Sequence, residues 1–282
     1  MNDAVTMSNV HKTVDDFQLK SINLEIERGT ISALIGKNGA GKSTLIKMIM
    51  NLMKSDEGDI QLLGQSVSTE DESWKTNIAY LPQKLPLTVP FTGHEMKELI
   101  LQWYPSWDEH YFQEIVSLFG VDLSKKMKKL SPGVQQQLNL ALVLARNTPV
   151  LILDEPTAHL DIPSKQILNN LLIEWMDKGE RTIILATHQI EDIQKLADYL
   201  VVLKGGKIRG QFEKEELTDM YKRYWFSQPL ECAAVPGEVE RKEHSLTTKC
   251  PIEAEDFLLQ ENIRWTNVQT VALDEIITML LV

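Results

Sequence analysis

A run of small and polar residues between two apolar segments has the residue types and spacing needed to bind phosphate. It comprises Gly36, Lys37, Asn38, Gly39, Ala40, Gly41, Lys42, Ser43 and Thr44. The spacing fits the pattern G-x-x-x-x-G-K-S/T, in which glycines keep side chains away so that successive backbone N–H groups can surround phosphate oxygens. We expect Lys42 to reach the β- and γ-phosphates and the hydroxyl of Ser43 to be a Mg²⁺ ligand.

The sequence on either side predicts the elements that hold this loop. Residues 30–35 are an apolar run that predicts a strand, and residues 45–50 predict the body of a helix that starts at Lys42. The free N–H groups and the positive dipole end of that helix both favour an anion. A glycine-rich turn that binds nothing is the alternative, but a chance match with a strand before it and a helix after it is rare. The sequence therefore predicts a strand–loop–helix unit that binds phosphate.

Two carboxylates and a histidine follow two further apolar runs. Residues 150–153 lead into Asp154 and Glu155, and packing alone does not explain two carboxylates at the end of a buried strand. Residues 182–186 predict another strand, and His188 follows it. A lone histidine is usually structural, but ligands of open α/β sheets bind just beyond the carboxyl ends of the strands. His188 is therefore a candidate site residue.

The alternation of predicted strands and helices indicates an α/β fold. Residues 1–30 predict a β meander, with strands at 4–10, 17–19 and 22–26, which we expect to open the sheet that carries the phosphate loop. Further predicted strands lie at 59–63, 78–81 and 199–203, and further predicted helices at about 164–178 and 191–197.

Between residues 84 and 147 the pattern is helical. Thr92 has the spacing of a capping box with Glu95, and Asp108 can cap a second helix. Ser131, followed by a proline, can cap a third. We expect the aromatic side chains of this region to be core residues, with a surface for a partner protein as the minor alternative. They are Trp103, Tyr104 and Trp107.

Composition and charge limit the class of protein. The chain has 282 residues, 43% hydrophobic and 24% charged, which is typical of a globular protein of one or two domains. No apolar run approaches the roughly 18 to 20 residues of a membrane span, and the first residues lack the pattern of a signal peptide. The net charge of −11 argues against a surface that follows a nucleic-acid backbone, so we expect no nucleic-acid partner. We expect Lys125, Lys126, Lys128 and Lys129 to form a solvated loop and Cys232 and Cys250 to be reduced thiols.

Taken in order, these elements closely resemble the ATPase subunit of ABC transporters over roughly residues 1–211. The phosphate loop resembles the Walker A motif, and residues 150–154 resemble Walker B, with Glu155 in the place of the catalytic glutamate. Gln83 stands where the family has its Q-loop glutamine, and His188 stands where it has the switch histidine. The D-loop falls at residues 158–161.

The resemblance is partial in the signature motif. Residues 130–134 are Leu-Ser-Pro-Gly-Val where the family has L-S-G-G-Q. Pro132 lacks the N–H of the glycine that it replaces, and Val134 replaces the glutamine. In the family, Ser131 and Gly133 of one subunit would close over ATP bound to the other.

The family's other site residues can be placed in the same way. The implied Mg²⁺ ligands are Ser43, Gln83 and Asp154, and the implied catalytic residues are Glu155, His188 and Gln83, with Glu155 as the general base. The aromatic that stacks on adenine falls near Val14, so Phe17 is the substitute, although Phe17 is about as well explained as a core residue.

The resemblance also implies an architecture and partners. We expect a P-loop NTPase core with an antiparallel β subdomain, a helical subdomain at about 84–147 and an accessory domain at 212–282, where residues 263–265 predict a strand and residues 273–281 a final helix. The implied partners are ATP, a second ATPase subunit, in the simplest case an identical one, and a separate permease, which places the protein at the cytoplasmic face of the cell membrane.

A narrower resemblance concerns the direction of transport. A signature of L-S-x-G type, the segment 104–108 and a divergent tail resemble bacterial exporter ATPases of the peptide-antibiotic kind. The alternative is a soluble ABC ATPase of DNA repair or translation, which is disfavoured because neither a coiled-coil insertion nor a second P-loop is present. A P-loop kinase or switch GTPase would not explain residues 130–133 together with His188.

Overall fold

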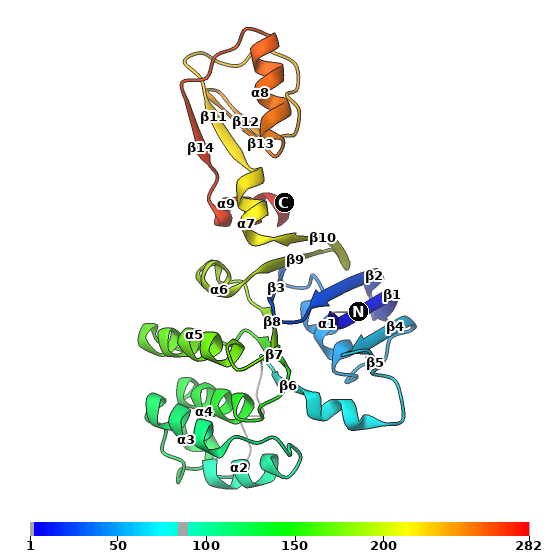
Figure 1. The fold of residues 1–282 in the computed structure, drawn as a ribbon, viewed down its shortest axis with the longest axis vertical. Helices are drawn as coiled ribbons and strands as arrows, with labels where there is room; N and C mark the ends of the chain where they lie inside the picture. The colour runs from blue at the N-terminus through cyan, green and yellow to red at the C-terminus, as the bar shows by residue number, and fades with distance from the viewer. Residues whose placement is uncertain (1–2, 84–89, 282) are drawn as a thin grey trace. The chain divides into compact units, whose positions relative to one another are not determined.

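The computed structural model describes residues 3–83 and 90–281. The chain divides into two compact units, residues 1–210 and 211–282, which are considered one at a time (Figure 1). Within the described residues, no helix is both long enough and apolar enough to span a bilayer.

The first unit is built on a sheet with the strand order β10-β9-β3-β8-β7-β6. Its parallel strands are β3 (Ile31–Ile35), β6 (Ile78–Leu81), β7 (Val150–Asp154), β8 (Thr182–Ala186) and β9 (Tyr199–Lys204), and β10 (Lys207–Glu213) lies at one edge. Every residue of β3, β7 and β8 is buried, which is the pattern of central parallel strands covered on both faces. The carboxyl ends of these strands meet at one edge of the sheet.

The N-terminal strands form a separate sheet, so the expectation that residues 1–30 open the sheet of the phosphate loop is wrong. The strands β1 (Asp3–Val14), β2 (Phe17–Glu27), β4 (Glu57–Leu62) and β5 (Gln65–Ser66) are antiparallel and follow the order β2-β1-β4-β5. Residues 17–27 form one strand, because irregular pairing with β1 absorbs the break that suggested two. Alternating burial in β2 gives this sheet one solvated face, whereas β3 is buried on both.

Helix α1 (Lys42–Ile49) fills the space between the two sheets. Its Ile46 belongs to the same buried cluster as Met7 of β1 and Ile184 of β8. The short helix that precedes β6 (Glu72–Asn77) adds the buried Trp74 to this cluster. The phosphate loop is therefore attached to a helix that packs on both sides.

A second core holds the helical region and the far face of the parallel sheet. Its helices are α2 (Gly93–Leu101), α3 (Glu109–Phe119), a short helix at Met127–Lys129, α4 (Pro132–Leu144), α5 (Ile162–Met176) and α6 (Ile190–Leu196) (Figure 1). Thr92, Asp108 and Ser131 cap α2, α3 and α4, as predicted. Residues 84–89 of the predicted helical region lie outside the described residues.

The prediction that the aromatic residues of this region are core residues is wrong for Trp103, whose surface is 76% exposed. Helix α2 ends at Leu101, and the turn that follows carries Trp103 away from the buried face. Trp107 is half-buried and packs on Phe112, with ring centroids 5.4 Å apart. Tyr104 accepts a hydrogen bond from Arg146.

The second unit is a small α+β fold with an antiparallel sheet in the order β12-β13-β11-β14. Its elements are α7 (Lys214–Met220), β11 (Lys222–Trp225), β12 (Glu238–Lys242), β13 (Ser245–Thr248), α8 (Pro251–Gln260), β14 (Asn267–Thr270) and α9 (Leu273–Leu281). Leu258 of α8 packs on Tyr224 and Leu246 of the sheet. The two cysteines are free thiols.

The strand predicted at residues 263–265 is wrong, and the final helix is confirmed as α9. The N–H of Ile263 bonds to the carbonyl of Leu258 and closes the end of α8. Trp265 meets Tyr224 edge to face at 5.5 Å. These apolar residues anchor a connection, and the strand follows them as β14.

A pair of glycines tests how the β1–β4 pairing is maintained. Gly58 and Gly64 both have positive φ, but a Cβ at Gly58 would lie 2.5 Å from the carbonyl oxygen of Asn9, whereas a Cβ at Gly64 would meet nothing within 4 Å. We expect Gly64→Ala to lower the free energy of unfolding by about 1 kcal/mol through backbone strain alone. Gly58→Ala is expected to lower it by about 3 kcal/mol, measured by urea unfolding. Equal losses at both positions would contradict the packing argument.

Candidate functional site

The phosphate loop joins β3 to α1 in the predicted way. Gly39 has a φ of 80° and Gly41 a φ of 110°, values that favour glycine. A Cβ at Gly41 would lie 2.8 Å from the rings or methyls of Phe17 and Leu19, so the loop is pressed against the β1–β2 hairpin. No side chain caps α1, which leaves its first N–H groups open to an anion.

Lys42 lies over this loop with its ammonium group donating to the carbonyl of Gly36 at 2.7 Å. Burial lowers the pKa of Lys42, and the nearby charges of Glu155 and Asp154 partly oppose that effect. The cation is therefore held beside the loop at a free-energy cost, in a place where a polyphosphate would compensate its desolvation.

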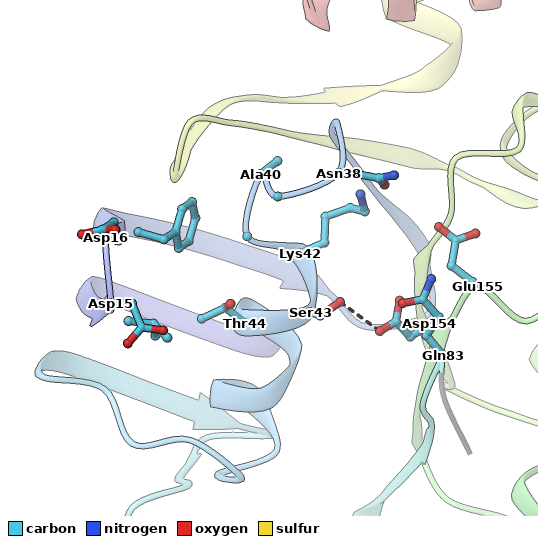
Figure 2. A pocket seen from close by; sticks show the side chains of 14 residues that line it. Asp15, Asp16, Asn38, Ala40, Lys42, Ser43, Thr44, Gln83, Asp154 and Glu155 are labelled. Atoms are coloured by element: carbon cyan, nitrogen blue, oxygen red, sulfur yellow. Dashed lines mark hydrogen bonds between the residues drawn. The ribbon is translucent and has the colours of Figure 1, made fainter. Parts of the chain in front are cut away.

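Ser43 and Asp154 bring a hydroxyl and a carboxylate together from two different strand ends. Ser43 Oγ donates to Asp154 Oδ2 at 3.2 Å, the contact drawn as a dashed line in Figure 2. Burial raises the pKa of Asp154. The pKa of Tyr80 is raised to about 12, mainly by burial of Tyr80 and in second place by the negative charge of Asp154. One hydroxyl and one carboxylate fit Mg²⁺, which is usually held by few protein oxygens together with phosphate and water.

Glu155 follows Asp154 and is paired with His188. Nδ1 of His188 lies 2.8 Å from Oε1 of Glu155, and the side chains are 69% and 7% exposed, respectively. Glu155 has a φ of 53°, and its N–H bonds to the carbonyl of Ala186 on β8. Its second oxygen, Oε2, is buried and has no hydrogen-bond partner among the described residues. A buried acceptor that lacks a donor is a suitable base for a water molecule.

Lys42, Ser43, Asp154 and Glu155 line one cavity of about 880 Å³, a volume suited to a nucleotide. Its walls are Val14, Asp15, Asp16, Phe17, residues 38–44, Gln83, Asp154 and Glu155 (Figure 2). Gly36, Lys37 and His188 adjoin this set without lining it. Asp15 and Asp16 were missed, because two aspartates between predicted strands are the ordinary composition of a turn. Phe17 lines the cavity and also packs on the core between the sheets.

The signature segment lies elsewhere. Ser131 and Gly133 do not line the cavity of their own chain. Ser131 Oγ accepts from the N–H of Val134 at 3.4 Å, a long contact, and Pro132 occupies the first turn of α4. A Cβ at Gly133 would lie 2.8 Å from the carbonyl oxygen of His159 in the same chain.

The fold and the site define a P-loop protein of the α/β class that binds and hydrolyses nucleotide. The family model described as ABC transporter matches residues 19–158. The petrobactin import ATP-binding protein FpuC of Bacillus anthracis is 33% identical over 212 residues, which cover 71% of this chain and 78% of that protein. The Nod factor export ATP-binding protein I of Rhizobium etli is 30% identical over 223 residues, which cover 77% of this chain and 70% of that protein.

The fold recurs in a dimeric ATP-binding cassette solved in a post-hydrolysis state with ADP and Pi. It matches 74% of this chain and 98% of that chain with a TM-score of 0.66 and 24% identity. The chain therefore belongs to the ATP-binding subunits of ABC transporters, and it is an ATPase.

The raised pKa of Asp154 gives a stability test. The folded protein binds this proton more tightly than the unfolded chain, so the contribution favours folding below about pH 4 and is lost as the pH rises. At pH 7 the buried carboxylate lowers stability. We expect Asp154→Asn to stabilise the nucleotide-free protein by about 1 kcal/mol at pH 7 and to weaken its further stabilisation by MgATP.

The measurement is thermal unfolding at pH 5 and pH 7, with and without MgATP. Asp256→Asn, an exposed aspartate of α8, is the control and should change neither value. If the Asp154→Asn protein without nucleotide is less stable than the wild type, the buried carboxylate of Asp154 does not lower the stability of the protein as argued.

Proposed function

We propose that this chain is the ATP-hydrolysing subunit of an exporter, that two such subunits pair around two MgATP, and that the pair drives a separate membrane subunit from the cytoplasmic face. The observation that supports this best is the meeting of Lys42, Ser43, Asp154 and Glu155 in one cavity, from the ends of β3 and β7. Each group has the charge and position that phosphoryl transfer to water requires.

The roles of the residues follow from their contacts. The loop amides and Lys42 would bind the phosphates, while Ser43 and Asp154, with Gln83 among the same lining residues, would hold Mg²⁺. When bound, Mg²⁺ neutralises the charge of the β- and γ-phosphates. Glu155 takes the proton of the attacking water, and His188 holds the Glu155 carboxylate in place and reaches the γ-phosphate.

Pairing of two subunits is supported by the place of the signature segment. Because Ser131 and Gly133 lie outside the cavity of their own chain, any ATP that they bind is the ATP of a second subunit. Pro132 has no N–H group, so the first turn of α4 has one backbone donor fewer with which to bind that ATP.

Coupling to a membrane subunit is supported by the exposed aromatic and aliphatic side chains of the helical region. Trp103, in the turn after α2, is the largest, and Phe91 and Leu99 are also exposed. Large exposed aromatic side chains such as Trp103 are enriched at interfaces with a protein partner. The L-S-x-G signature and the segment 104–108 favour export, although FpuC, by its name, serves import.

Hydrolysis can be tested at the base. Glu155→Gln keeps the shape and the hydrogen bond to His188 but removes proton acceptance, so ATP turnover should fall by about a hundredfold or more, while ATP binding persists. Steady-state phosphate release and nucleotide binding are the measurements. Glu114→Gln, on the exposed face of α3, is the matched control and should keep the wild-type rate. A normal rate in Glu155→Gln would show that another group is the base.

Pairing can be tested on the same variant. With hydrolysis blocked, MgATP shared across two subunits stabilises the dimer, so Glu155→Gln protein should elute as a dimer with MgATP and as a monomer without it. The double variant Lys42→Ala/Glu155→Gln should stay monomeric in both conditions. A dimer that ignores nucleotide would instead assign dimerisation to another surface, such as that of residues 211–282.

A further inference from the structure

The loop that carries the proposed base is held in an unfavourable backbone conformation. Glu155 and His159 have φ values of 53° and 65°, in the left-handed region that residues with a Cβ rarely adopt. Within the loop, the N–H of Ala158 bonds to the carbonyl of Glu155, and the N–H of Leu160 to that of Thr157. Such strain persists only where surrounding contacts maintain it.

One of these contacts comes from the start of α4. Gln136 is buried, and its Nε2 donates to the carbonyl of Pro156 at 2.9 Å. This bond fixes the residue directly after Glu155 from one side of the loop.

A second contact comes from α6, and both of its residues are almost fully buried. Thr157 Oγ1 donates to Asp192 Oδ2 at 2.7 Å, and the two residues are 2% and 3% exposed. Burial raises the pKa of Asp192, and the hydrogen bond from Thr157 opposes that effect. Burying a carboxylate costs free energy that a single hydrogen bond does not fully offset. A role for this bond beyond stability would explain why the cost is tolerated.

The position of this bond in the chain indicates that role. Thr157 is two residues after Glu155, and Asp192 is four residues after His188. The bond therefore joins the two backbone segments that carry the Glu155–His188 pair. The His188 side chain is 69% exposed, so packing does little to fix it. The backbone bond from Glu155 to Ala186 joins the two segments before His188, and the Thr157–Asp192 bond joins them again beyond it.

We propose that Thr157 and Asp192 are positioning residues for ATP hydrolysis, whose buried hydrogen bond keeps the carboxylate of Glu155 and the imidazole of His188 in contact. Neither residue lines the nucleotide cavity, so both act through Glu155 and His188 and not by touching ATP. The inference rests on the proposed function, because it requires Glu155 to be the base.

The test separates positioning from stability. Thr157→Val keeps the shape and removes the hydroxyl, and should lower kcat at least tenfold with less than a twofold change in KM for ATP. Thr157→Ser restores the hydroxyl and should recover most of the lost rate. Rates are expressed per molecule competent to bind nucleotide and are compared with melting temperatures, so that loss of folded protein is not counted as loss of catalysis.

Two further variants complete the design. Thr148→Val is the matched control, because Thr148 is also 2% exposed, donates to the carbonyl of Val150, and precedes the opposite end of β7. It should lower the melting temperature but keep kcat within twofold. The double variant Thr157→Val/Asp192→Leu replaces both partners by apolar side chains, which restores stability without the bond. It should melt near the wild-type temperature and remain at least tenfold slow.

A double variant that recovers both stability and kcat would overturn the proposal, because the bond would then serve folding only. So would a Thr157→Val protein with normal kcat, or one slowed only through a higher KM. If Glu155→Gln hydrolyses ATP at the normal rate, the proposed base fails and the positioning role fails with it. An inactive Glu155→Gln beside a fully active Thr157→Val would refute the positioning role alone.

Discussion

The structure depends on three adjacent parallel strands that end at the same level. Leu34 of β3 and Asp154 of β7 are both register partners of Ala186 on β8, so the segments after these strands emerge side by side. The two faces of these strands pack in two different cores, so a slip by one residue would exchange side chains between cores that they do not fit, which makes this register firm. The phosphate loop, the two carboxylates and the histidine occupy those segments. The strand register therefore brings these groups close together, whether or not their side chains contact one another.

The same arrangement concentrates charge where water is scarce. Lys42, Asp154 and Glu155 are all buried, and burial shifts the pKa values of Lys42 and Asp154 in the directions that favour their neutral forms. A triphosphate and its metal ion would supply the opposite charges, so binding relieves part of the desolvation cost. The buried charges that lower the stability of the site are therefore the same charges that favour binding, a common balance in enzymes.

The sequence predicted the elements of the site because each depends on local pattern. The phosphate loop, the strand before Asp154 and Glu155, and the caps Thr92, Asp108 and Ser131 are set by residues within a few positions of one another. Features that depend on distant partners were not predictable. The division of residues 3–35 between two sheets follows from the pairing of β1 with β4, and Trp103 is exposed because α2 ends just before it. Likewise, nothing in the chain near Thr157 points to Asp192, thirty-five residues away.

The close approach of Gly133 to the carbonyl of His159 also affects how the signature motif can be interpreted. A side chain at this position would collide with the chain's own backbone, so selection for correct folding is sufficient to preserve the glycine. Pro132 begins α4 and Val134 packs against the core of the helical region, and they are the positions at which this chain departs from the family. A glycine retained for internal packing gives no information about turnover. In a signature that departs from the family's, the presence of this glycine is therefore no evidence by itself for a contact with ATP across subunits.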